Sequence, residues 1–268
     1  MAALLSPDTT FKNLFIAACD GNDLQKVQYL FHLGADVNWR DLYGWSGLHI
    51  AAENNYGELQ ELLLSKTGVN VNIRRNDGQT PLMAASIRGN KNIMMRLCQV
   101  DGIQVNSRDV DGWTALHWAV YINRAACVSV LGGLAGIDWN ARSNAGNYPL
   151  TMAVENGFAD ILQIILSQSH LELNMINSRG RNIAQLAVES PFFRGDRQRC
   201  LKLLCGDRRF DPYWNVKNPD GETPVMFCLK NDRTTMATTL IANSSVDLDT
   251  VDSEGRHLED IARSVFNI

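Results

Sequence analysis

The sequence predicts an all-α solenoid of about seven to eight stacked helix-turn-helix units, joined by β-hairpin-like loops. The first observation is a glycine that returns at a fixed step of 34 residues, with one step of 41. The second is a pair of short helical patterns after each of these glycines, of which the second is the more apolar. A fixed period of roughly 20 to 50 residues indicates repeated units that bury their apolar faces against their neighbours.

The composition fits a folded protein and limits the classes of function. With 45% hydrophobic and 20% charged residues, the chain is unlike a disordered protein. Its net charge of -4 argues against a surface devoted to nucleic acid, though not against a local basic patch. The N-terminus lacks the charged region of a signal peptide, and no apolar run reaches membrane-spanning length. Six cysteines among apolar helical residues, without a Cys-x-x-Cys pair, favour reduced thiols in an intracellular, cytoplasmic protein; a nuclear location stays open.

Each repeat is organised around its turn glycine. A residue that recurs at one structural position indicates a backbone requirement, here a positive φ in a tight turn. Six residues earlier stands an asparagine (Asp249 in the last copy), whose short side chain can bond the local backbone and hold the loop. The glycines are Gly44, Gly78, Gly112, Gly146, Gly180, Gly221 and Gly255, and the asparagines are Asn38, Asn72, Asn106, Asn140, Asn174 and Asn215.

A first helix is predicted after each turn, and a second after a further short turn. Two residues past the glycine, a hydroxyl or amide can cap the free N–H groups of the first helix. These positions hold Ser46, Thr80, Thr114, Tyr148, Asn182, Thr223 and His257, and Pro81, Pro149 and Pro224 follow three of them. Segments such as 59–64, 93–98 and 161–166 repeat apolar residues at intervals of three and four, as a second, core-facing helix requires. Gly34, Gly68, Gly102 and Gly136 suit the left-handed residue that ends such a helix.

We expect one repeat domain over residues 1–268. The unit that begins at residue 177 holds seven extra residues, between Ser190 and Asn215. The expected units are approximately 8–40, 41–74, 75–108, 109–142, 143–176, 177–217 with the insertion, 218–251, and a partial C-terminal cap at 252–268.

The recurring residues resemble the ankyrin repeat family. Its signature runs Asp-x-x-Gly-x-Thr-Pro-Leu-His-x-Ala-Ala and, after the second helix, Gly-Ala-Asp-Val-Asn. The segment Gly34-Ala-Asp-Val-Asn38 is a literal match, and Thr114-Ala-Leu-His117 matches with one change. The unit at Asn182 keeps the spacing but lacks the Thr-Pro and the histidine. The resemblance implies a non-catalytic protein-interaction module or adaptor, without a cofactor, that binds a protein or peptide on its concave face and finger tips.

The resemblance also indicates which residues would bind a partner. In this family the turn tips and the exposed side of the first helices vary most and bind most. Exposed tryptophan and tyrosine are typical of binding hot spots, although these rings could instead pack along neighbouring fingers. The predicted binding residues are Leu42, Tyr43, Trp45, Glu53, Asn54, Gln79, Arg88, Val110, Asp111, Trp113, Tyr121 and Asn147.

The positions of the histidines favour a structural role over a catalytic or metal-binding role. His49 and His117 occupy the position where the family uses histidine as a structural bridge between loops. No Asp, Ser or Cys recurs at a spacing that would form a triad or a metal site. A phosphate-binding glycine loop is also missing. We therefore expect no catalytic residues, no metal and no cofactor.

Two further sites are candidates of a weaker kind. The insertion concentrates positive charge that could meet an acidic partner, a phosphate or a nucleic acid, although a solvated helix and loop is the favoured interpretation. By family resemblance, Asn38 is a candidate for asparaginyl β-hydroxylation, the alternative being an unmodified loop clamp. The charged residues of the insertion are Arg194, Arg197, Arg199, Lys202, Arg208 and Arg209.

These observations favour a protein-binding module that is monomeric by itself and does not insert into a membrane. One alternative is a module that senses a nucleotide, an oligonucleotide or another anionic ligand by stacking and phosphate pairing. Nucleic acid is the less favoured partner because the net charge is negative. Another alternative is a structural spacer within a larger protein.

Overall fold

The computed structural model describes residues 7–177, 179–189, 195–243 and 245–266. In these residues the secondary structure is helical, apart from turns and loops, which confirms the all-α class. The chain divides into two compact units, residues 1–138 and 139–268. Across the described part of the chain, no helix is both long and apolar enough to cross a membrane.

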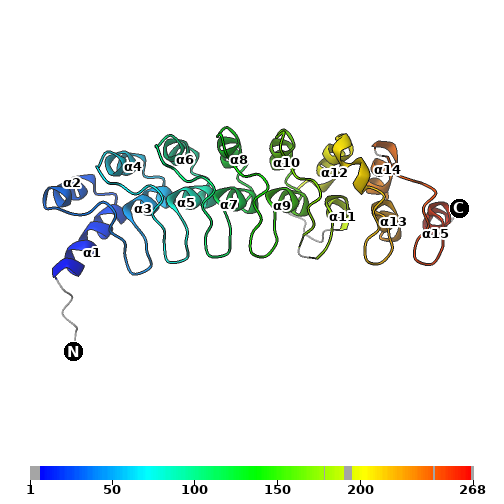
Figure 1. Ribbon diagram of the computed structural model, residues 1–268, viewed down its shortest axis with the longest axis horizontal. Helices are drawn as coiled ribbons and strands as arrows, with labels where there is room; N and C mark the ends of the chain where they lie inside the picture. The colour runs from blue at the N-terminus through cyan, green and yellow to red at the C-terminus, as the bar shows by residue number, and fades with distance from the viewer. Residues whose placement is uncertain (1–6, 178, 190–194, 244, 267–268) are drawn as a thin grey trace, which may run out of the picture. The chain divides into compact units, whose positions relative to one another are not determined.

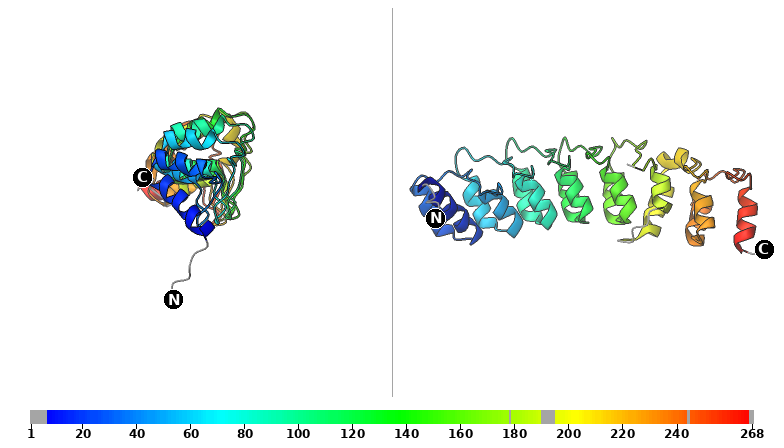
Figure 2. Two further views of the ribbon diagram at one scale, coloured as in Figure 1. Left: turned by 90° about the vertical axis from the view of Figure 1, so that its left-hand side faces the viewer. Right: turned by 90° about the horizontal axis from the view of Figure 1, so that it is seen from below.

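The first unit is built from two rows of helices. The first-helix row packs α1 against α3, α3 against α5 and α5 against α7, and the outer row packs α2, α4, α6 and α8 in the same order (Figure 1). Figure 2 shows the helices of this unit standing side by side. The bounds are α1 (Pro7–Asp20), α2 (Leu24–His32), α3 (Gly47–Asn54), α4 (Gly57–Leu64), α5 (Pro81–Arg88), α6 (Lys91–Cys98), α7 (Ala115–Tyr121) and α8 (Ala125–Gly132).

The loops before the first helices form hairpin-like fingers, as predicted. In the finger that precedes α3, Arg40 and Ser46 form an antiparallel bridge, and the Asp41 N–H donates to the Trp45 carbonyl at 2.8 Å. Gly44 adopts φ +87° at the tip, where only glycine is unstrained. The turn glycines of the other repeats also have positive φ, and so do Gly34, Gly68, Gly102 and Gly136 at the ends of the second helices.

Four of the predicted helix caps are confirmed, and two are wrong. The side chains of Ser46, Thr80, Thr114 and Asn182 accept hydrogen bonds from the N–H groups three residues on. Tyr148 and Thr223 make no such cap, and the buried Thr223 hydroxyl has no partner within the described residues. A proline follows both positions, but it also follows the capped Thr80, so the proline does not explain the two missing caps. For Tyr148, the hydroxyl stands at the far end of the ring, too far from its own backbone to serve as a helix cap.

The asparagines six residues before each turn glycine bond a more distant partner than predicted. The Asn38 amide donates to the Gly68 carbonyl at 2.8 Å and accepts from the Asn70 N–H at 2.8 Å. Asn72 makes the same two bonds, to Gly102 and Gln104. The expected local bonding is therefore wrong for these side chains. Each one instead joins its loop to the equivalent loop of the next repeat.

The second unit continues the two-row pattern. Its first-helix row consists of α9, α11, α13 and α15, and its outer row of α10, α12 and α14. Part of the insertion forms the 3-10 helix η1, whose Phe210 is buried against the helices beside it. The bounds are α9 (Pro149–Asn156), α10 (Ala159–Leu166), α11 (Ile183–Glu189), α12 (Arg197–Cys205), η1 (Arg208–Tyr213), α13 (Pro224–Lys230), α14 (Thr234–Asn243) and α15 (Leu258–Phe266).

Candidate partner-binding face

The tips of the fingers in the first unit expose apolar side chains on a rigid support. Leu42 is 90% exposed and Tyr43 74%, and Val110, at the tip before α7, is 60% exposed. The backbone under them is held, because Asn76 donates its side-chain amide to the Leu42 carbonyl at 2.8 Å and its N–H to the Tyr43 carbonyl at 3.2 Å. The Val110 N–H donates in turn to the Asp77 carbonyl at 3.0 Å. Neighbouring fingers are thus tied together directly beneath the exposed side chains.

Trp113 belongs to a cluster of three aromatic rings on α7 and its finger. Its ring lies 4.6 Å from that of Trp118 and 5.1 Å from that of Tyr121, which is 37% exposed. Asp109 fixes this arrangement: its carboxylate accepts from the Trp113 N–H at 2.8 Å and from the Trp118 indole N–H at 2.9 Å. Trp113 is half-buried. The ring therefore contributes to the packing of its own repeat and still borders the solvent, beside the exposed Asp111.

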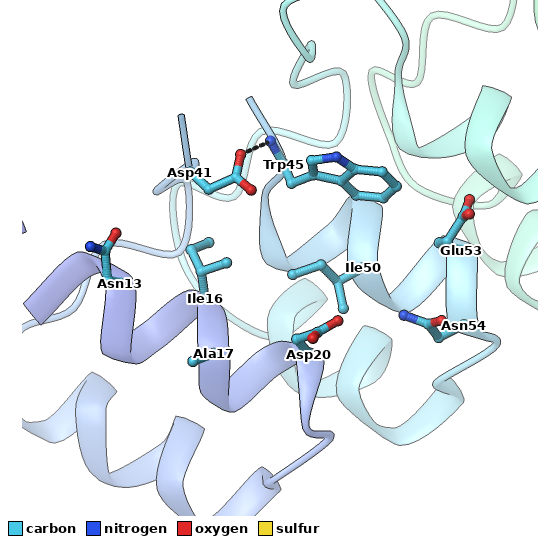
Figure 3. Close-up of a pocket in the computed structure, with 9 residues that line it drawn as sticks. All are labelled: Asn13, Ile16, Ala17, Asp20, Asp41, Trp45, Ile50, Glu53 and Asn54. Carbon is cyan, nitrogen blue, oxygen red and sulfur yellow. Dashed lines mark hydrogen bonds between the residues drawn. The ribbon is translucent and has the colours of Figure 1, made fainter. Parts of the chain in front are cut away.

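Trp45 borders a cleft that the sequence did not predict. The cleft has a volume of about 440 Å³ and lies between α1, the first finger and α3 (Figure 3). Trp45 is half-buried, and the Arg75 guanidinium lies 4.1 Å from the centre of its ring. Three of the predicted binding residues meet at this cleft. Its lining consists of Asn13, Ile16, Ala17, Asp20, Asp41, Trp45, Ile50, Glu53 and Asn54.

The residues from α1 were not predicted, because the predicted binding residues were placed by reference to the turn glycines, of which Gly44 is the first. Asn13, Ile16, Ala17 and Asp20 reach the cleft because α1 packs beside α3. The sequence does carry a signal for α1, since Leu14 and Ala17 stand 34 residues before Leu48 and Ala51 of α3.

Other predicted residues hold the face together. Glu53 on α3 forms an ion pair with Arg88 on α5, which links two adjacent first helices. Gln79 is half-buried, and its backbone carbonyl lies 3.0 Å from Nε2 of His49. Asn147 belongs to the second unit, where its N–H donates to the Ser143 hydroxyl at 3.0 Å.

His49 is a structural bridge, as the family resemblance implied. The ring is buried, with Nδ1 at 2.8 Å from the Ser46 hydroxyl and Nε2 on the next finger. Burial lowers the pKa of His49 to about 4, against a smaller opposing effect of its hydrogen bond to Gln79. The imidazole is therefore neutral near pH 7 and serves to join two repeats. His117 is buried in the equivalent position, with Nδ1 at 2.9 Å from the Thr114 hydroxyl.

The cationic residues of the insertion do not converge on one site. Arg199 donates to Asp160 at 2.7 Å and to Gln163 at 3.2 Å, which ties α12 to α10. Arg209 donates to Asp207 and to the Leu166 carbonyl at 2.7 Å. Arg197 is half-buried, and burial followed by repulsion from Arg233 lowers its pKa. Lys202 and Arg208 are exposed, and Arg194 lies outside the described residues.

Comparison with known proteins agrees with this architecture. The family profile described as "Ankyrin repeats (3 copies)" matches residues 14–109 and 48–143. The chain is 35% identical over 79 residues to the 2-5A-dependent ribonuclease of Homo sapiens, which is 29% of this chain and 10% of that protein. It is 34% identical over 79 residues to Rabankyrin-5 of Homo sapiens, 29% of this chain and 7% of that protein.

A third relative is the protein phosphatase 1 regulatory subunit 27 of Homo sapiens, 37% identical over 65 residues, which are 24% of this chain and 41% of that protein. The chain thus covers less than two thirds of the length of each of these relatives. Ankyrin repeats in general are protein-interaction modules. The period, the buried histidine bridges, the hairpin fingers and the profile match over residues 14–143 together show that the chain contains ankyrin repeats.

Proposed function

We propose that this protein is a non-catalytic interaction module that binds a protein or peptide through the first-helix row and finger tips of its first unit. The observation that carries the proposal is the exposure of Leu42 and Tyr43 on a backbone that two Asn76 hydrogen bonds hold in place. Burying large, solvent-exposed apolar side chains against a partner lowers the free energy of the complex, and tyrosine is enriched at binding hot spots. With the fingers already ordered, little conformational entropy is lost on association.

The structure gives less support to the alternative of an anion-sensing module. Arg199 and Arg209 already donate to acceptors of the protein itself, so a phosphate would have to compete with those bonds. The three aromatic rings around Trp113 pack at 4.6 to 6.4 Å from one another. Because each ring already has another as its neighbour, stacking a base there would require the cluster to open.

The test compares two pairs of exposed apolar residues on opposite rows. Leu42→Ser with Tyr43→Ser alters the finger tip, and Tyr29→Ser with Leu33→Ser is the matched control, on and just after α2. Tyr29 and Leu33 are 61% and 54% exposed, so both pairs remove comparable exposed surface. We expect affinity capture from cell lysate, read by quantitative mass spectrometry, to lose its specific binders with the first variant and to keep them with the second.

Two results would contradict the proposal. One is the same set of binders at the same abundance with the tip variant. The other is loss of the binders with the α2 variant only, which would move the interface to the outer row. Circular dichroism spectra of the two variants check that both remain folded.

A further inference from the structure

We propose that the cleft between α1 and α3 receives a lysine or arginine side chain from an extended segment of the partner. The inference rests on the proposed function, because it assumes that a protein or peptide binds on this face. It adds the chemistry of the bound segment and the place where its basic residue inserts.

The cleft has an apolar floor and a polar rim. Ile16 from α1 and Ile50 from α3 are buried and form the floor, and the Trp45 ring closes one side (Figure 3). Carboxylates of Asp20, Asp41 and Glu53 stand around it. Lysine and arginine combine an apolar stem with a charged head, so the stem can cover the isoleucines while the head meets the rim.

The rim keeps a negative net charge after the ion pairs that its carboxylates form within the protein are counted. Among the residues that the structure describes, the lining contains three carboxylates and no lysine, arginine or histidine. Glu53 is offset by Arg88. The Asp41 carboxylate accepts the N–H groups of Tyr43 and Trp45, which fixes its position but leaves its charge unneutralised.

Asp20 is exposed at the end of α1, in the last turn, where the free carbonyl groups add partial negative charge. Two carboxylate charges therefore remain for a ligand. An anionic segment would be repelled from this rim, and a purely apolar one would leave both carboxylates partly desolvated without a partner.

The indole of Trp45 lines the cleft and already holds one cation of the protein itself. Arg75 already lies over the Trp45 ring, in contact with its π face. Arg75 does not line the cleft, so the part of the ring that borders the cleft is not the part this guanidinium covers. A second cation can therefore reach Trp45 from the cleft without displacing Arg75.

The experiment uses the full chain and a displayed library of random twelve-residue peptides. We expect the selected peptides to share a lysine or arginine at a fixed position. The affinity of one such peptide, measured by fluorescence polarisation, should fall about tenfold with Asp20→Asn plus Asp41→Asn, because two ion pairs near the surface are lost. Replacing the fixed basic residue by glutamine should cause a similar loss, and raised salt should weaken binding to the wild type but not to the variant.

The variant is designed to keep the fold. Asp41→Asn preserves the oxygen that accepts the two N–H bonds of the finger. Asn177 and Asn218 occupy the same position in later repeats and accept the same pair of bonds. Glu58→Gln plus Asp101→Asn changes the net charge equally at exposed positions outside the cleft, and should leave the affinity within about twofold.

The outcomes separate the two proposals. Peptides that lose binding with Leu42→Ser plus Tyr43→Ser, but carry no fixed basic residue and ignore Asp20→Asn plus Asp41→Asn, would overturn the inference and leave the proposed function standing. Peptides that ignore both variants, or a wild-type chain that selects no peptide, would overturn the inference, whereas the proposed function is decided by the capture experiment with Leu42→Ser plus Tyr43→Ser. A dimer seen by light scattering and abolished by Asp20→Asn plus Asp41→Asn would make a second copy of this chain the occupant, contrary to the inference.

Discussion

At the scale of single residues, one structural task is performed by different side chains along the chain. His49 joins the Ser46 hydroxyl on one side to the Gln79 carbonyl on the other. In the diverged repeat, Gln185 accepts from the Asn182 N–H at 3.0 Å and donates to the Val216 carbonyl at 3.4 Å. Like the imidazole, the amide links the start of its own helix to a backbone carbonyl of the next repeat, although that carbonyl lies at a different position of the repeat. At this position glutamine replaces histidine, and the repeat keeps a hydrogen-bonded link to the next repeat.

This replacement yields a prediction about pH. Because the folded pKa of His49, about 4, lies below the ordinary 6.5, the unfolded chain binds the proton more tightly. Stability is therefore complete above about pH 6.5 and is lost as the pH falls toward 4. Between about pH 6.5 and about pH 4.5 this one group should lower the free energy of unfolding by roughly 2 kcal/mol.

The measurement is urea unfolding of the wild type and of Ser46→Asn plus His49→Gln, which copies the Asn182–Gln185 pair. The double variant should show a flatter dependence on pH in that window, because the amide does not titrate. The two chains share their other histidines, so those residues cancel in the comparison. Equal slopes for the two chains would mean that His49 is not held neutral by burial.

At the scale of elements, the finger is the unit that both the sequence and the structure define most sharply. The recurring glycines identified each finger because a positive φ at one position is a strong local constraint. The ties between fingers were not predictable in the same way. Asn38 and Asn76 reach partners about 30 residues away, and local side-chain chemistry does not reveal which carbonyl a neighbouring repeat will present.

Alanine substitutions at Gly34 and Gly44 distinguish the cost of a strained backbone from the cost of a steric clash. Gly34 and Gly44 have φ values of +90° and +87°, but a Cβ at Gly34 would meet no atom within 4 Å, whereas a Cβ at Gly44 would lie 2.6 Å from the Asn76 nitrogen. Gly34→Ala should cost about 1 kcal/mol, the strain of the left-handed backbone alone. Gly44→Ala should cost at least about 2 kcal/mol, because the second finger must also move.

Urea unfolding of the two alanine variants measures the difference. Equal losses would show that the contact between the tips of adjacent fingers contributes nothing to stability. A larger loss at Gly34 would reverse the assignment of the crowded position.

At the scale of the whole molecule, the period predicted the class of fold and the resemblance of the recurring residues indicated the family, but neither predicted the cleft. A residue type that recurs at one position of each repeat indicates a structural requirement that all the stacked repeats share. The cleft lies where α1 packs beside α3, and the period does not reveal which side chains of the two helices border the space between them. Trp45 was predicted from its exposed position before the helix, whereas Asp20 and Ile16 become neighbours of that ring only through packing.

The insertion in the second unit also shows that contacts between repeats cannot be predicted from the sequence alone. Its arginines read as a basic patch in the sequence, because charge that is close along the chain is easily counted. In the structure, Arg199 and Arg209 turn toward acceptors on α10 and at its end. Their partners precede them by about 40 residues, and only the stacking of one repeat on the next brings them together.

The central claim is that the partner contacts the finger tips of the first unit. Photo-crosslinking tests it most directly, with benzoylphenylalanine placed at position 43 or, as a control, at position 29 of the full chain in cells. Both positions hold exposed tyrosines, on a finger and on the outer-row helix α2, respectively. We predict a discrete adduct of higher mass from position 43 and none from position 29. An adduct from position 29 alone, or no adduct from position 43, would contradict the claim.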